Sequence, residues 1–168
     1  MEFRRLDRLE VTEEQFKQIM DVENSTGSGY EEEIMKSIWL EDEKDDNFVC
    51  VTDDKIVAHI SFNPNSKRRN GSVYMVNLTV TNEYRKRGIA QNLIYTACKY
   101  YESKKISIPM SLQVDKDNIP ALNLYKKVGF EIREPICEAD EDDEQYVMDS
   151  SVENIIKTIE RNINKRSC

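Results

Sequence analysis

The sequence is poor in the residues that build metal and redox centres. It has one histidine, His59, and four cysteines, and no two cysteines are close enough for a Cys-x-x-Cys motif. A zinc site made of His and Cys, or a triad that needs a histidine other than His59, is therefore not expected. We expect no metal, and we expect each cysteine to be a reduced, partly buried thiol.

Long apolar runs and an excess of positive charge are missing as well. No run approaches the roughly 18 apolar residues of a membrane span, and the segment 1–7 has no apolar signal-peptide core. We therefore expect a cytoplasmic protein without a membrane partner. The net charge of −8 disfavours a nucleic-acid partner, because duplex binders present a basic face.

The size and composition fit one soluble domain. The chain has 168 residues, of which 39% are hydrophobic and 33% are charged. A chain of this length buries roughly two thirds of its unfolded surface, so it needs neither disulfides nor a metal to fold. We predict a single domain over 1–168.

Hydrophobic periodicity divides the chain into alternating helices and strands. The predicted helices are 13–24, 30–40, 88–101, 118–128 and 151–165. The predicted strands are 2–9, 47–52, 55–62, 72–81, 109–114, 130–135 and 145–148, with a polar loop at 63–71. Thr12 and Gln15 have the spacing of a capping box. This order predicts an α/β layered domain with a mixed sheet, antiparallel before the helix at Gly88 and parallel across it.

The junction between the strand ending near Val80 and the helix starting at Gly88 carries the strongest chemical signal. The first N–H groups of a helix have no intrahelical partner and attract anions. Gly88 and Ala90 are small enough for an anion to approach these amides, and the segment 85–87 is basic in an acidic chain. The pattern indicates an anionic ligand, and the alternative is a solvated basic turn. Neither Gly-x-x-x-x-Gly-Lys-Ser/Thr nor Gly-x-Gly-x-x-Gly occurs.

Two segments resemble the GNAT superfamily of acyl-CoA-dependent N-acetyltransferases. Residues 85–90, following the strand end 78–80, are similar to the family's Arg/Gln-x-x-Gly-x-Gly/Ala signature. Residues 118–130 are similar to its Asn-x-x-Ala-x-x-x-Tyr-x-x-x-Gly-Phe stretch. The resemblance is specific over about 72–132 and looser elsewhere, and the terminal helix 151–165 lies beyond the usual core.

The resemblance implies a GNAT-type mixed, mostly antiparallel sheet of about six to seven strands flanked by helices, with an extra C-terminal helix. It also implies acetyl-CoA as co-substrate. Backbone groups of the strand would bind the pantetheine and the thioester, amides of the following turn and helix would bind the pyrophosphate, and one side chain would lie near the pantetheine. These cofactor-binding positions are Leu78, Thr79 and Val80; Arg85, Lys86, Arg87, Gly88, Ile89, Ala90 and Gln91; and Asn118.

Tyr125 resembles the family's general acid. A phenol has a pKa of about 10, so it keeps its proton at neutral pH and can give it to the departing thiolate. The alternative is a packed tyrosine. No base is evident, because family members carry a glutamate where this chain has Tyr74 or Gln113. Asp115 shares the face of Gln113, and His59 reads more readily as strand packing. An amine of low pKa, or a water relay near Tyr74 and Gln113, would remove the need for a carboxylate.

The resemblance therefore implies an acyl-CoA N-acyltransferase in which a primary amine attacks the thioester directly in a ternary complex. No cysteine has a base beside it in the sequence to support an acyl-cysteine route. A non-catalytic acyl-CoA-binding or sensing module is the main alternative, and a protein-interaction domain is the third. The acidic segment 138–144 either attracts a cationic substrate or is a solvated turn. The isoleucines of 152–163 pack on the protein's own sheet or against a second subunit.

Overall fold

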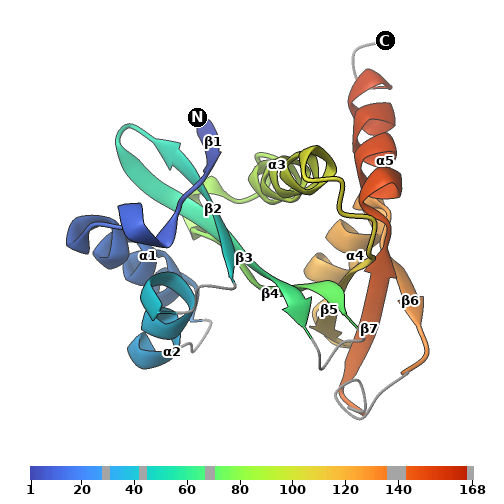
Figure 1. The fold of residues 1–168 in the computed structure, drawn as a ribbon, viewed down its shortest axis with the longest axis horizontal. Coiled ribbons are helices and arrows are strands. Elements are labelled where there is room, and N and C mark those ends of the chain that lie inside the picture. Colours follow the sequence, from blue (N-terminus) through green and yellow to red (C-terminus); the bar gives the residue numbers. More distant parts are fainter. Residues whose placement is uncertain (28–30, 42–44, 67–70, 136–142, 166–168) are drawn as a thin grey trace. The chain divides into compact units, whose positions relative to one another are not determined.

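A computed structural model describes residues 1–27, 31–41, 45–66, 71–135 and 143–165 (Figure 1). The helices are α1 (Glu13–Thr26), α2 (Glu32–Lys36), α3 (Ile89–Ser103), α4 (Ile119–Val128) and α5 (Val152–Asn164). The strands are β1 (Glu2–Arg5), β2 (Asp46–Thr52), β3 (Lys55–Ser66), β4 (Ser72–Val80), β5 (Met110–Asp115), β6 (Glu131–Arg133) and β7 (Gln145–Ser150). The predicted order of helices and strands is confirmed.

The strands form a seven-stranded open sheet with the hydrogen-bonded order β1-β2-β3-β4-β5-β7-β6. The β1–β2, β2–β3, β5–β7 and β6–β7 pairs are antiparallel. The β4–β5 pair is parallel, with Val73 opposite Met110 and Tyr74 opposite Ser111. The sheet is thus mixed and mostly antiparallel, and its parallel connection runs through α3, as the sequence predicts.

Two compact units make up the chain. The first comprises Met1–Asn63 and Val76–Ala97, and the second comprises Pro64–Met75 and Cys98–Cys168. Three elements, β3, β4 and α3, continue from one unit into the other.

The core of the first unit lies where α1 and α2 cover one side of the strands (Figure 1). Its cluster of buried hydrophobic residues comprises Leu6, Ile19, Val22, Met35, Ile38, Trp39, Val49 and Ile56. α1 begins at the predicted capping box, in which Gln15 N donates to Thr12 Oγ1 at 3.2 Å and Thr12 N donates to Gln15 Oε1 at 3.0 Å. The cap fixes the start of the helix, and the apolar stripe then fixes which face is buried.

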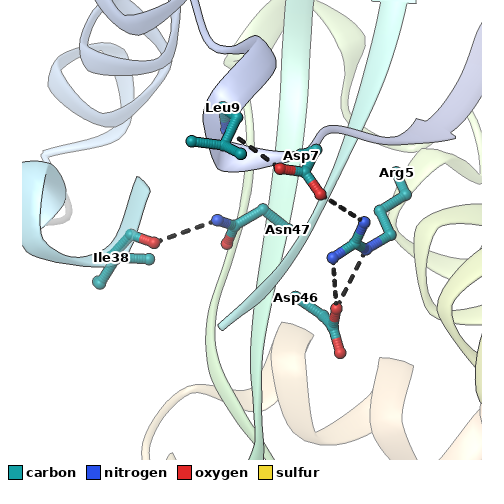
Figure 2. A network of polar contacts seen from close by, with 6 residues as sticks. All are labelled: Arg5, Asp7, Leu9, Ile38, Asp46 and Asn47. Atoms are coloured by element: carbon teal, nitrogen blue, oxygen red, sulfur yellow. Dashed lines mark hydrogen bonds and ion pairs between the residues drawn. The ribbon is translucent and has the colours of Figure 1, made fainter. Parts of the chain in front are cut away.

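A polar network ties the first strand to the rest of this unit (Figure 2). Arg5 donates from Nε to Asp46 Oδ1 at 3.1 Å and from Nη1 to Asp7 Oδ2 at 3.0 Å. The Leu9 amide donates to Asp7 Oδ1 at 3.1 Å, and this bond, followed by the Arg5 guanidinium, lowers the pKa of Asp7. Asn47 Nδ2 donates to the Ile38 carbonyl at 3.1 Å. The network joins β1 to the start of β2 and to the helical segment after α2.

The second unit packs α4 and α5 with β5, β6 and β7. α5 contacts α4 and buries a stripe made of Val152, Ile155, Ile156 and Ile159. The C-cap of α4 is Gly129, with φ of +105°, and its carbonyl accepts from Ser150 Oγ at 2.7 Å and from Asn154 Nδ2 at 3.0 Å. The isoleucine stripe is therefore buried within its own chain.

The largest differences between the structure and the sequence prediction are at three places. The first strand ends at Arg5 rather than 9, because Asp7 caps a 3-10 turn over Arg8–Glu10. The second helix changes to a π-helical turn over Ser37–Glu41. Strand β3 continues through 63–66, which the sequence predicts as loop.

Several predictions lie outside the described residues. They concern the basic segment 67–69, most of the acidic segment 138–144, and Cys137 and Cys168.

Candidate functional site: the junction of β4 and α3

A tight turn connects the end of β4 to α3. The backbone forms a 3-10 turn over Asn82–Tyr84, and the Thr81 amide donates to the Val57 carbonyl of β3 at 3.0 Å. Asn82 Nδ2 donates to the Ser25 carbonyl of α1 at 3.0 Å. These bonds hold the turn against β3 and α1, so the start of α3 has a fixed position within the first unit.

The backbone at the start of α3 has the geometry of an anion site. Lys86 has φ of +62° and Gly88 has φ of +79°, and left-handed residues near a helix start turn successive amides toward one concavity. The first hydrogen bond of the helix runs from Asn92 N to Gly88 O at 3.0 Å. The amides of 88–91 consequently have no acceptor within the helix. A Cβ added to Gly88 would meet nothing closer than Asn92 Nδ2 at 3.9 Å, so the approach is open.

The three basic side chains of the turn are exposed, but they do not play equal parts. Arg85 Nε donates to the Val80 carbonyl at 3.1 Å, and this bond closes the turn. The Arg87 guanidinium lies over the Tyr84 ring, 5.0 Å from its centroid. Arg85 and Arg87 thus shape the turn as well as adding positive charge to it.

The cofactor-binding positions predicted on β4 and α3 gather in the first unit. Leu78 and Val80 are half-buried on β4, and Thr79 is buried. Ile89 and Gln91 are buried on the first turn of α3, so Ile89 offers a ligand only its amide. The main-chain groups, rather than these side chains, are the ones available for binding.

Asn118 and Tyr125 lie together in the second unit. Asn118 is the N-cap of α4, and its Oδ1 accepts from the Ala121 amide at 3.2 Å. Tyr125 is buried on the same helix, and its ring meets the Phe130 ring edge-on with centroids 5.9 Å apart. Asn118 therefore has a helix-capping role in addition to the predicted cofactor contact, and Tyr125 is held by ring packing.

Sequence reasoning missed a buried acidic residue. Glu23 of α1 is 1% exposed. Thr79 Oγ1 of β4 donates to its Oε1 at 2.8 Å, and Asn77 Nδ2 of β4 donates to the same oxygen at 3.4 Å. We call Glu23, His59, Asn77 and Thr79 the Glu23 cluster. The signal was present in the sequence, because Glu23 follows Phe16, Ile19 and Met20 on an otherwise apolar helical stripe.

His59 completes the Glu23 cluster from β3. Its ring is fully buried, and Nε2 lies 2.8 Å from Glu23 Oε1. The two atoms are as close as in an ion pair, but the imidazole is not oriented for a hydrogen bond from Nε2 to the carboxylate. The Trp39 ring meets the imidazole edge-on, at 5.4 Å between centroids. His59 is packed in the core, as the sequence favours, and it also faces a carboxylate.

Two polar side chains of β4 point toward α1. Val76 packs against the hydrophobic cluster of the first unit, and the next residue, Asn77, contacts Glu23 of α1 and Met35 of α2. Successive strand residues normally point to opposite faces. Asn77 and Thr79, which are two residues apart, therefore lie on one face of β4, and both contact Glu23.

The described residues contain no group of three or more His, Cys, Asp or Glu side chains placed to hold a metal ion. In the same part of the chain, no helix combines the length and the apolar character needed to cross a membrane.

The protein is a mixed α/β domain in which the start of α3, at the end of β4, is open and has left-handed residues at Lys86 and Gly88. The model of the GNAT family of acetyltransferases matches residues 10–130. The chain therefore belongs to the GNAT acetyltransferase family.

Solved structures of acetyltransferases share the fold. The aminoglycoside 6'-N-acetyltransferase from Enterococcus faecium matches with a TM-score of 0.71 and 17% identity, over 90% of this chain and 97% of that one. The ribosomal-protein-S18-alanine N-acetyltransferase from Escherichia coli matches with a TM-score of 0.71 and 16% identity, over 90% and 94%. Arabidopsis thaliana NAA60 in complex with acetyl-CoA matches with a TM-score of 0.68 and 18% identity, over 90% and 96%. No curated protein sequence matches significantly.

Proposed function

We propose that this protein is an N-acetyltransferase that moves the acetyl group of acetyl-CoA to a primary amine. The observation that carries the proposal is the β4–α3 junction, where Lys86 and Gly88 have positive φ angles and the amides of 88–91 have no acceptor within the helix, a geometry that suits an anion. Coenzyme A supplies the diphosphate that such a site suits.

The proposed binding mode is the one that the family resemblance implies. The pyrophosphate would contact the amides from Lys86 to Gln91. The pantetheine arm would then run along the backbone of Leu78, Thr79 and Val80, whose carbonyl and amide groups suit the amides of the arm and the thioester oxygen. Asn118 would bind the pantetheine through Nδ2, because its Oδ1 caps α4.

The proposed reaction is direct attack of a neutral amine on the thioester carbon. Alignment of the two reactants provides much of the acceleration, and main-chain donors stabilise the oxyanion. Tyr125 would protonate the leaving thiolate of coenzyme A. An acyl-cysteine route is not supported at Cys98, because burial raises the pKa of that thiol to about 12 and only the thiolate is a good nucleophile.

The acceptor is best sought among amines of low pKa. Deprotonating a lysine-like amine at pH 7 costs about 4–5 kcal/mol, whereas an α-amine costs about 1 kcal/mol. The structural neighbours named above include an enzyme for an aminoglycoside and one for a protein alanine. These names make amino sugars and peptide N-termini the first two classes to test.

The test combines binding and turnover. Calorimetry measures coenzyme A binding, and release of free thiol from acetyl-CoA measures transfer across a panel of peptide N-termini, aminoglycosides, polyamines and amino acids. Binding together with amine-dependent thiol release is the expected result. Binding without release for any amine favours the non-catalytic acyl-CoA module, and absence of binding at millimolar coenzyme A refutes both.

A further inference from the structure

The Glu23 cluster is not used by the mechanism above, although it is attached to the strand that would present the thioester. Glu23 and His59 are almost completely buried, and a buried carboxylate is costly unless other groups pair with it. Here the Thr79 hydroxyl, the Asn77 amide and His59 Nε2 all approach the same oxygen, Oε1. The hydrogen bonds from Thr79 and Asn77 thus satisfy the buried carboxyl group of Glu23.

We propose that Glu23 accepts the proton that the amine loses during acetyl transfer, and that the Thr79 hydroxyl passes this proton to it. The inference rests on the proposed function, and it supplies the base that Tyr74 and Gln113 do not. A hydroxyl can do this because it donates one hydrogen bond while its lone pairs accept another. Thr79 Oγ1 already donates to Glu23 Oε1 at 2.8 Å.

In the proposed reaction, each bond that forms is matched by a bond that breaks. The amine nitrogen forms a bond to the acetyl carbon, and the bond from that carbon to sulfur breaks with its electron pair staying on sulfur. The ammonium proton moves to Thr79 Oγ1 as the original Thr79 proton moves to Glu23. The thiolate takes the phenol proton of Tyr125. Glu23 and Tyr125 return to their starting states by exchange with solvent after the products leave.

The position of Thr79 supports this route. It is the middle residue of the 78–80 backbone that would bind the thioester, and it is 7% exposed, whereas Glu23 is 1% exposed. The hydroxyl of Thr79 lies on the α1 side of β4, because it donates to Glu23 Oε1, as does Asn77 two residues earlier on the same face. Glu23 is too deeply buried to meet an amine directly, so a relay residue is needed.

His59 acts as a positioning residue in this scheme. Its Nε2 lies 2.8 Å from Glu23 Oε1, and the edge contact with Trp39 fixes the ring. The titratable groups of the cluster are Glu23 from α1 and His59 from β3. Because His59 is the only histidine of the chain, its ring nitrogens give a single set of nuclear magnetic resonance signals that report on this cluster.

The kinetic test uses Thr79→Val, which removes the hydroxyl and keeps the shape, with Thr79→Ser as the conservative variant and Glu23→Gln as the variant of the acceptor. With the best amine of the panel, we expect Thr79→Val and Glu23→Gln to lower kcat by about 100-fold, which is typical of a lost proton acceptor. KM for acetyl-CoA should stay within threefold, and Thr79→Ser should recover most of kcat. The control is Thr96→Val, which removes the hydroxyl that donates to Asn92 O on α3, and which should leave kcat unchanged.

The spectroscopic test follows the ¹⁵N signals of the His59 ring while coenzyme A is added. We expect saturation to shift them in the wild type and to shift them much less in Thr79→Val. If Glu23→Gln does not fold, the comparison of Thr79→Val with the wild type tests the relay by itself. Wild-type kcat in Thr79→Val, or unmoved His59 signals at calorimetrically confirmed saturation, overturns the relay and leaves the proposed function intact. A wild type that does not bind coenzyme A, or binds it and acetylates no amine, overturns both.

Discussion

At the scale of single residues, the conformation of Gly88 is the feature on which cofactor binding depends most directly. Its φ of +79° belongs to the region that favours glycine, and a Cβ there has open space around it. A substitution should therefore have a conformational cost without a steric one, and it should place a methyl group among the amides that face the ligand.

We predict that Gly88→Ala destabilises the protein by about 1–2 kcal/mol, because alanine is strained at positive φ, and weakens coenzyme A binding by at least about tenfold. Calorimetry and urea unfolding measure the two effects. The matched control is Gly27→Ala, since Gly27 has φ of +66° and also has nothing within 4 Å of an added Cβ. It should lose similar stability and keep its affinity. Equal affinities in the two variants would refute the anion site.

The second prediction at this scale concerns the hydroxyl group of Tyr125. Tyr125→Phe keeps the ring contact with Phe130 and removes only the proposed acid. We expect kcat to fall by about 100-fold, with coenzyme A affinity within threefold. Tyr101→Phe, in another buried tyrosine, is the control and should keep wild-type turnover. If Tyr125→Phe turns over as fast as the wild type, Tyr125 is not the acid.

The Cys98 thiol supplies a third prediction. Burial raises its pKa to about 12, so at pH 8 only about one thiol in ten thousand is a thiolate. Iodoacetamide should not label Cys98 in the folded protein at that pH and should label it rapidly in guanidinium. Peptide mapping by mass spectrometry measures both. Labelling of native Cys98 at the rate of a free thiol would show that the site is open.

At the scale of elements, α5 lies beyond the residues 10–130 that the family model matches. Its stripe of hydrophobic residues is buried. Asn154 of α5 donates to the carbonyl of Gly129 at the end of α4, and so does Ser150 of β7. A Cβ on Gly129 would lie 3.1 Å from Asn154 Nδ2 and 3.2 Å from Thr158 Oγ1. α5 therefore stabilises the position of α4, which carries Tyr125.

We predict that Ile155→Ala, at a position with 0% exposure, lowers the free energy of unfolding by about 2–5 kcal/mol, as expected for a truncated buried isoleucine. Ile163→Ala, on the same helix at 45% exposure, should lower it by less than about 1 kcal/mol. Thermal and urea unfolding measure both variants. Equal losses would mean that the stripe is not the packed face of α5.

The elements that the sequence predicts correctly are those with local signals. The Thr12–Gln15 capping box forms, and the turn between β2 and β3 falls at Asp53 and Asp54, which both have positive φ. The extension of β3 could not be predicted, because Pro64 normally indicates a loop. β2 begins at Asp46, opposite Phe62, so the missing N–H of Pro64 removes no hydrogen bond to β2.

The candidate site likewise has a part that the sequence predicts and a part that it does not. The sequence locates the strand-to-helix junction, because the chemistry there depends on adjacent residues. It does not show that Lys86 is left-handed or that Arg85 closes the turn on Val80. The contacts of the Glu23 cluster could not be predicted from the sequence, because Asn77 and Thr79 are 54 and 56 residues from Glu23. The position of Glu23 on an apolar stripe indicates that it is buried, but nothing local shows which residues pair with it.

At the scale of the whole molecule, the division into two units raises the question of whether they unfold together. Strands β3 and β4 and helix α3 each continue through both units. Unfolding of either unit alone would therefore interrupt all three of these elements. We propose on this ground that residues 1–168 form one cooperative domain.

The single tryptophan makes this proposal testable. Trp39 is fully buried in the first unit, so its fluorescence reports on that unit, whereas far-ultraviolet circular dichroism reports on the helices of both. For one cooperative domain, the two probes should give coincident urea curves. Ile155→Ala, in the second unit, should shift both curves equally, and so should Ile19→Ala in the first. A fluorescence curve unmoved by Ile155→Ala would instead show two independently unfolding domains, since a core mutation in one would then leave the environment of Trp39 unchanged.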